Sequence, residues 1–228
     1  MTKSSSNGHA TFEPVAKPEV KVRKVKAETP GAIGIILPKI DIKRIVFEVV
    51  GTAPLIVNCF SQKAKKEILD TQMKVAKKGR EAKNPKEMFE NSLYKFPDGK
   101  KTGFTAIGFK CGMVRAGMLL GMPMTQTRCK FHVIPDDMAN DGTPLIEIKG
   151  KYIMREDAVR LQNGSADLRY RACYPKWSAN VTIQYNATWI SEEQIANLLN
   201  HAGFACGIGE WRPEKGNGGM YGMYAVAG

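Results

Sequence analysis

Residues 177–203, WSANVTIQYNATWISEEQIANLLNHAG, contain a strand that is followed by a helix. Apolar and polar residues alternate along Trp177–Ala187, which is the period of a strand with one face on a core and the other in water. The apolar positions are Ala179, Val181, Ile183 and Tyr185. The strand therefore belongs to a sheet with one polar, open face.

The helix after this strand has clear signals at both ends. Ser191 and Gln194 match a capping box, and Ile190 and Ile195 match the hydrophobic staple that accompanies it. Gly203 is expected to end the helix, because glycine readily adopts the left-handed conformation found there.

The rest of the chain supplies further elements. Apolar periodicity predicts strands at 42–50, 127–134, 145–148 and 220–226, and helices at 61–80 and 104–120. Residues 152–171 are polar, and we interpret them as a functional loop or an excursion from the sheet. Without these insertions the order is strand, helix, strand, strand, helix, strand. That order predicts an α+β, ferredoxin-like fold with a four-stranded antiparallel sheet and two helices on one face.

The expected organisation is an N-terminal arm and one domain. Residues 1–40 are rich in Ser, Lys and Pro and predict a basic, flexible arm. Its apolar part, residues 31–38, could add a strand to a neighbouring subunit or pack on its own domain. Residues 41–228 form a single α+β domain with insertions at about 61–102 and 136–172.

The net charge is +12, and most of it lies in the first half of the chain. Residues 1–101 contain 21 basic and 11 acidic residues, a net of +10. A local excess of this kind attracts phosphates, and it equally serves solubility or contact with an acidic protein.

Basic residues in three segments are the candidates for nucleic-acid binding. The predicted helix at 61–80 is polar enough to be solvent-exposed or to lie against a polyanion. The glycine-rich segment 207–222 brings a tryptophan and two cations together, for stacking on a base or for capping the edge of the core. The candidates are Lys63, Lys65, Lys66, Lys74, Lys77, Lys78, Arg80, Arg155, Arg160, Arg169, Arg171, Trp211, Arg212 and Lys215.

The sequence gives little support for catalysis, so we predict that the protein is not an enzyme. No catalytic residues, metal ligands or cofactor are predicted, because no nucleophile motif or zinc-ligand spacing is present. The five cysteines are widely spaced and odd in number, which favours mostly buried, reduced thiols. No apolar run is long enough for a membrane span, and the N-terminus lacks the apolar core of a signal peptide. We therefore expect a cytoplasmic protein that does not associate with membranes.

Two stretches resemble a family of uncharacterised bacteriophage proteins. They are GTAPLIVNCFSQKAKKEILDTQ, from Gly51, and the segment from Met154 to Gly216 that contains GEWRPEK. This resemblance implies a phage gene product in a bacterial cytoplasm. A weaker similarity is to the RAMP superfamily, the RNA-binding backbone subunits of CRISPR effector complexes. It rests on the glycine-rich loop before the last strand and on the turn at Ala53-Pro54-Leu55, and it implies binding along a single strand with copies arrayed side by side.

These observations favour a non-enzymatic protein that binds single-stranded RNA or DNA, is phage-encoded and is oligomeric on its ligand. A phage virion structural or assembly protein is the first alternative, because a long apolar-tipped arm suits subunits that exchange arms. An inhibitor of a host defence complex is the second.

Overall fold

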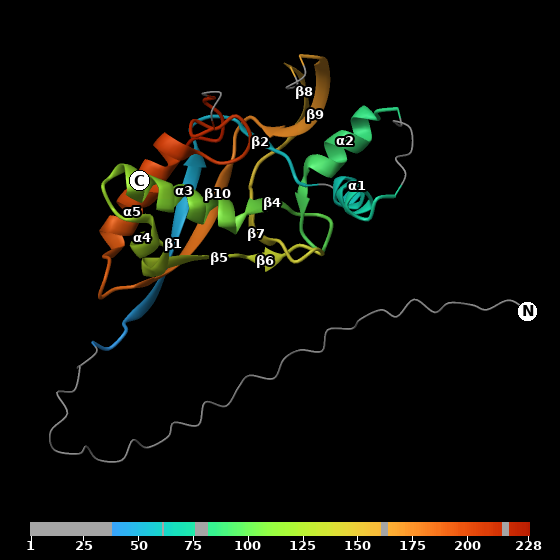
Figure 1. Ribbon diagram of the computed structural model, residues 1–228. Helices are drawn as coiled ribbons and strands as arrows, with labels where there is room; N and C mark the ends of the chain where they lie inside the picture. Colours follow the sequence, from blue (N-terminus) through green and yellow to red (C-terminus); the bar gives the residue numbers. More distant parts are fainter. Residues whose placement is uncertain (1–37, 61, 76–81, 161–163, 216–218) are drawn as a thin grey trace, which may run out of the picture. The chain divides into compact units, whose positions relative to one another are not determined.

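The computed structural model describes residues 38–60, 62–75, 82–160, 164–215 and 219–228, with the side chains of residues 62–64 left out. The chain separates into a segment Met1–Pro38 and a compact unit Lys39–Gly228. The latter is a mixed α+β unit built on three antiparallel sheets (Figure 1).

The main sheet has the strand order β11-β1-β10-β5. All three pairings are antiparallel, and the central pair runs from Ile42 opposite Asn186 to Val50 opposite Ser178. The prediction of a four-stranded antiparallel sheet in an α+β domain is confirmed. Its strands are β1 (Ile42–Gly51), β5 (Phe131–Ile134), β10 (Ser178–Asn186) and β11 (Tyr224–Val226).

Among the described residues, only one face of the main sheet is covered. Helices α3 (Ala106–Leu119) and α5 (Glu192–His201) contact each other, and in Figure 1 both lie in front of β1 and β10. The predicted alternation in the third strand is confirmed, because its apolar side chains are buried in the core beneath these helices. They are Ala179, Val181, Ile183 and Tyr185. The opposite face is open, with Val46 on β1 58% exposed.

The capping box of α5 is confirmed, but the predicted helix end is wrong. Ser191 Oγ accepts from Gln194 N, and Gln194 Oε1 accepts from Ser191 N. The chain then continues as a π-helical turn, η1 (Ala202–Cys206), and Gly207 with φ of 65° follows it. Gly203 serves a different purpose: a Cβ there would lie 1.9 Å from the carbonyl oxygen of Tyr224, so only glycine lets β11 approach.

Residues 152–171, predicted to be a functional loop or an excursion from the sheet, lie largely in the two paired strands of a β-hairpin. Strands β8 (Ile153–Arg160) and β9 (Ala166–Tyr174) pair along their whole length, and β9 also pairs with β2 (Leu55–Val57). The sequence signal failed because one face of the hairpin carries charged residues, so apolar alternation is missing. A third sheet has the order β3-β4-β7-β6 and contains β3 (Tyr94–Lys95), β4 (Thr102–Thr105), β7 (Pro144–Glu147) and β6 (Asp137–Met138).

Four predicted boundaries need correction. The strand predicted at 220–226 starts only at Tyr224. The helix predicted at 61–80 is α1 (Gln62–Gln72), and residues 76–81 lie outside the described part. Helix α3 begins two residues later than Phe104, because Phe104 lies in β4 and Thr105 caps the helix by accepting from Ile107 N. The strand predicted at 127–134 starts only at Phe131. Before it comes α4 (Met124–Lys130), whose last turn carries Arg128 and Lys130, favourable at a helix C-terminus. Helix α2 (Pro85–Ser92) was not predicted; it lies on β9, and Ser92 Oγ accepts from Ala172 N.

Candidate nucleic-acid interface

The β8–β9 hairpin meets the C-terminal loop at an aromatic pair. The guanidinium carbon of Arg155 on β8 lies 5.4 Å from the ring centroid of Trp211 and 4.8 Å from that of Tyr221. The two rings are 5.9 Å apart in an edge-to-face arrangement. Two of the three predicted binding segments therefore meet here. We call Arg155, Arg171, Trp211 and Tyr221 the arginine–aromatic cluster.

Close backbone contacts place Trp211 in this cluster. Tyr221 N donates to the carbonyl oxygen of Trp211, and a Cβ at Gly219 would lie 1.6 Å from that same oxygen. The loop is also tied to the β2 region, since Glu210 N donates to Ile56 O and Gly222 N to Pro54 O. These glycines permit contacts between parts of the protein's own backbone, and the contacts do not require a phosphate.

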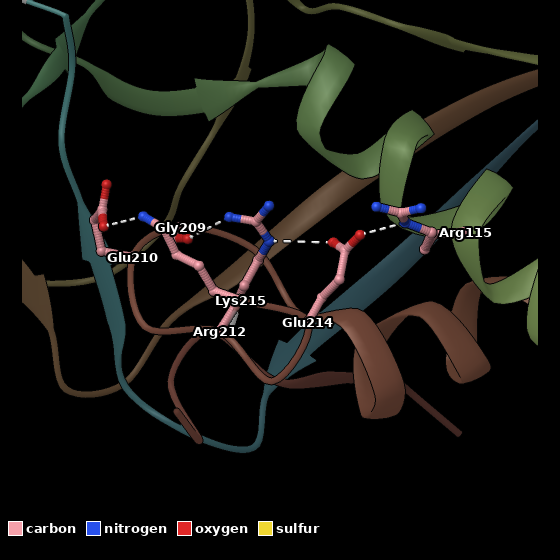
Figure 2. Close-up of polar contacts among 6 residues, drawn as sticks. All are labelled: Arg115, Gly209, Glu210, Arg212, Glu214 and Lys215. Atoms are coloured by element: carbon pink, nitrogen blue, oxygen red, sulfur yellow. Dashed lines mark hydrogen bonds and ion pairs between the residues drawn. The ribbon is translucent and has the colours of Figure 1, made fainter. Parts of the chain in front are cut away.

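Cations and carboxylates at the loop form two separate groups of ion pairs (Figure 2). Glu214 receives Arg212 Nε at 3.3 Å and Arg115 Nε of α3 at 2.5 Å, and Lys215 Nζ lies 2.5 Å from Glu210. Arg212 also donates to the carbonyl oxygen of Gly209. Burial alone would raise the pKa of Glu214, but the hydrogen bonds from Arg115 and Arg212 lower it below its usual value. Arg212 and Lys215 are thus engaged in holding the loop.

The hairpin side of the cluster contains buried charges. Arg155 and Arg171 lie opposite each other across the two strands, and Arg155 Nε binds Asp157 at 2.8 Å. Asp157 and Arg171 are 6% and 5% exposed, and one oxygen of Asp157 and Nη1 of Arg171 have no hydrogen-bond partner among the described residues. Burial lowers the pKa of Arg171, against the opposing effect of Glu210. Buried polar groups of this kind are rare in native proteins and are expected to have a specific role.

Other predicted residues lie elsewhere. Arg160, near the end of β8, is exposed, and Arg169 is half-buried on β9. Lys65 on α1 binds Asp141 at 2.6 Å, and Lys66 and Lys74 are exposed, with no hydrogen bond or ion pair to the hairpin or the loop in the part of the chain described. The side chain of Lys63 and all of Lys77, Lys78 and Arg80 lie outside the described residues.

Sequence reasoning missed several residues at this interface. Tyr221, the second ring under Arg155, follows the glycine run and carried no signal beyond being aromatic. Arg115 lies in the helix predicted at 104–120 and is not among the predicted binding residues. Glu210 and Glu214 alternate with the loop cations within GEWRPEK, a spacing that could have suggested internal ion pairs.

The open face of the main sheet is a second candidate surface. It carries Arg44, which donates to Gln184 Oε1 at 2.8 Å, and a hollow of about 190 Å³ whose lining includes His132, Lys130 and the exposed Trp189. Burial, aided by Lys110, lowers the pKa of His132, so this histidine adds little positive charge at neutral pH. This face therefore has fewer cations than the hairpin and loop.

Across the residues whose placement is described, no three His, Cys, Asp or Glu side chains gather as a metal site would require. No helix in that same part of the chain has the length and apolarity to cross a membrane. No protein-family model matches the sequence, and no curated protein matches it.

Proposed function

We propose that this protein is a non-enzymatic, single-stranded nucleic-acid-binding protein, encoded by a phage and acting in the cytoplasm of a bacterial cell. The observation that supports it most is the arginine–aromatic cluster, which joins Arg155 to Trp211 and Tyr221 across more than 50 residues of sequence. Aromatic rings and guanidinium planes are the groups on which unpaired bases stack without sequence preference.

The contacts divide the predicted binding residues into two roles. Arg212 and Lys215 are paired with Glu214 and Glu210, so they shape the loop and contribute little to phosphate binding. Arg160 and Arg169 have no ion pair with another described residue, and they lie on the hairpin that carries Arg155. In this proposal Arg160 and Arg169 neutralise phosphates, while a base stacks against the rings that Arg155 orients.

The order β11-β1-β10-β5, with α3 between the first two strands along the chain and α5 between the last two, supports a ferredoxin-like classification of the main sheet. The similarity to the RAMP superfamily, which rests on the glycine-rich loop and on the turn at Ala53-Pro54-Leu55, is a separate argument for binding along a single strand. The binding surface in this proposal is the hairpin with its neighbouring loop, and the open sheet face is the competing one.

Two tryptophan variants locate the interface. Binding of a short single strand is expected to quench tryptophan fluorescence in the wild type and in Trp189→Phe, but not in Trp211→Phe. Trp189 is the matched control, because it is 51% exposed and lies at the hollow on the open face. Quenching that disappears with Trp189→Phe instead would assign binding to the open face and overturn the proposed site.

Charge variants test the phosphate contacts. Arg160→Gln and Arg169→Gln are expected to weaken binding several-fold and to lower the slope of log K against log salt by about 0.7 each. Lys176→Gln, an exposed cation outside the cluster, is the matched control and should leave that slope unchanged. Fluorescence anisotropy of a labelled oligonucleotide measures both quantities. The proposal is wrong if the wild type does not bind single strands at about 50 mM salt.

A further inference from the structure

Strand β1 has one edge that is largely unpaired. Strand β11 pairs only with Val49–Gly51, whereas β1 begins at Ile42. In the described part of the chain, no other strand lies on this side. Residues 42–47 of β1 therefore have one unpaired edge, although their other edge is fully paired with β10.

The backbone of this edge is ready to accept a strand. Gly51 N donates to Trp177 O and Asp41 O accepts from Ala187 N, so the odd-numbered residues of β1 bond to β10. Glu48 O accepts from Ala227 N, so the even-numbered residues face the other way. The N–H and C=O groups of Ile42, Arg44 and Val46 consequently point toward the free edge.

The side chains along the edge also lack cover. Ile45 and Phe47 face the core but are only half-buried, while Ile183 and Val181 opposite them on β10 are 0% exposed. Ile42 on the open face is 53% exposed. A long edge with exposed apolar side chains is a template for pairing with another strand.

We propose that this edge binds residues 31–37, GAIGIIL, from a second copy of the chain. This segment lies outside the described residues, has no charged side chain and ends immediately before Pro38, at the start of the described unit. Seven residues are enough to pair with residues 42–47. Main-chain hydrogen bonds supply the affinity, and the alternating Ile33 and Ile35 supply the apolar contacts.

Two features oppose pairing of this segment with its own β1. A two-residue hairpin loop needs positive φ, which Pro38 cannot adopt at its first position. In addition, Asp41 O accepts from Ala187 N, so the chain still runs along β10 at Asp41 and has not turned back there. In this proposal the strand is donated between copies, and each copy can both donate an arm and accept one.

The test uses the full-length protein without nucleic acid, in sedimentation experiments over a range of micromolar concentrations. The wild type is expected to form oligomers. Val46→Pro removes an N–H that faces the free edge and leaves the β10 ladder intact, so this variant should be monomeric. Val46→Thr keeps that N–H and is the matched control, which should still assemble. The double variant Ile33→Lys/Ile35→Lys disables the arm and should also be monomeric.

Mixing the two monomeric variants completes the test. The intact arm of Val46→Pro fits the intact edge of the Ile33→Lys/Ile35→Lys variant, so the mixture should yield one-to-one dimers. A monomeric wild type, or a mixture that stays monomeric, would overturn the proposal. A urea titration checks that Val46→Pro is folded; if it is not, the arm variant alone still decides, because it must lose assembly. Binding of a short oligonucleotide is measured separately, so failure of assembly is distinguishable from failure of nucleic-acid binding.

Discussion

At the scale of single residues, two glycines differ in whether the surrounding structure has space for a Cβ atom. A Cβ at Gly203 would lie 1.9 Å from a backbone oxygen of β11, which cannot move without breaking its pairing with β1. A Cβ at Gly112 would find its nearest neighbour, the Cβ of Ala202, at 3.8 Å, an ordinary contact.

Alanine at these two positions should therefore act in opposite directions. Gly203→Ala is expected to lower the free energy of unfolding by about 3 kcal/mol, the upper range for overpacking. Gly112→Ala should raise it by up to about 1 kcal/mol, because it removes a glycine from the interior of α3. Urea unfolding followed by circular dichroism measures both. Equal effects of the two variants would contradict the placement of η1 against β11.

The site residues show what a sequence can and cannot tell about a binding surface. The arginine-rich segment with Arg155 and the glycine-rich loop with Trp211 could each be singled out from composition. The cations that remain available to bind phosphate could not be identified from the sequence. The loop folds on itself and pairs Arg212 and Lys215 with Glu214 and Glu210. Ion pairing depends on the positions of the side chains in space, which cannot be inferred from composition.

At the scale of elements, Lys65 and Asp141 join α1 to the turn between β6 and β7. The hydrogen bond from Lys65, with those from Thr143, lowers the pKa of Asp141 to about 2. A carboxyl with a depressed pKa in the folded state stabilises the protein above its unfolded pKa of about 4. That contribution is lost as the pH falls toward about 2.

Asp141→Asn should therefore be less stable than the wild type at neutral pH and should lose this difference between about pH 4 and pH 2. Thermal unfolding at a series of pH values measures it. Lys65→Met removes the largest cause of the shift and should reproduce part of the same profile. A stability difference that stays constant from pH 7 to pH 2 would argue against this ion pair.

Elements differed in how far the sequence predicted them. β10 and the start of α5 were predicted because alternation, a capping box and a staple agree within one stretch. The β8–β9 hairpin was missed because charged residues occupy alternate positions on one of its faces. Arg155 and Asp157 on β8 lie opposite Arg171 and Arg169 on β9, so no alternation of apolar residues marks the strands. The alternation of Cys129, Phe131 and Val133 predicts a strand before β5, but Cys129 lies in α4.

At the scale of the whole molecule, the five cysteines divide by exposure. Cys111 and Cys129 are exposed, Cys59 is half-buried, and Cys173 and Cys206 are buried. The expectation of mostly buried thiols therefore applies only in part. Burial raises the pKa of the Cys59, Cys173 and Cys206 thiols, which lowers their reactivity as thiolates.

A disulfide reagent added to the native protein should thus label Cys111 and Cys129 rapidly and Cys59 more slowly. Cys173 and Cys206 should react only on unfolding. Absorbance of the released thiolate counts the labelled groups over time. The Cys111→Ser/Cys129→Ser variant should lack the fast phase, and a fast phase that persists in it would contradict this division.

The paired strands of the main sheet are far apart in the sequence, which affects how the chain folds during synthesis. Arg44 on β1 and Gln184 on β10 touch across the sheet but are 140 positions apart in the sequence. During synthesis, β1 leaves the ribosome long before either of its neighbours exists. Such a high contact order predicts slow folding, and the nascent chain exposes β1 on both edges throughout that time. Production of the protein should therefore depend on chaperones and on growth temperature more than its final stability would suggest.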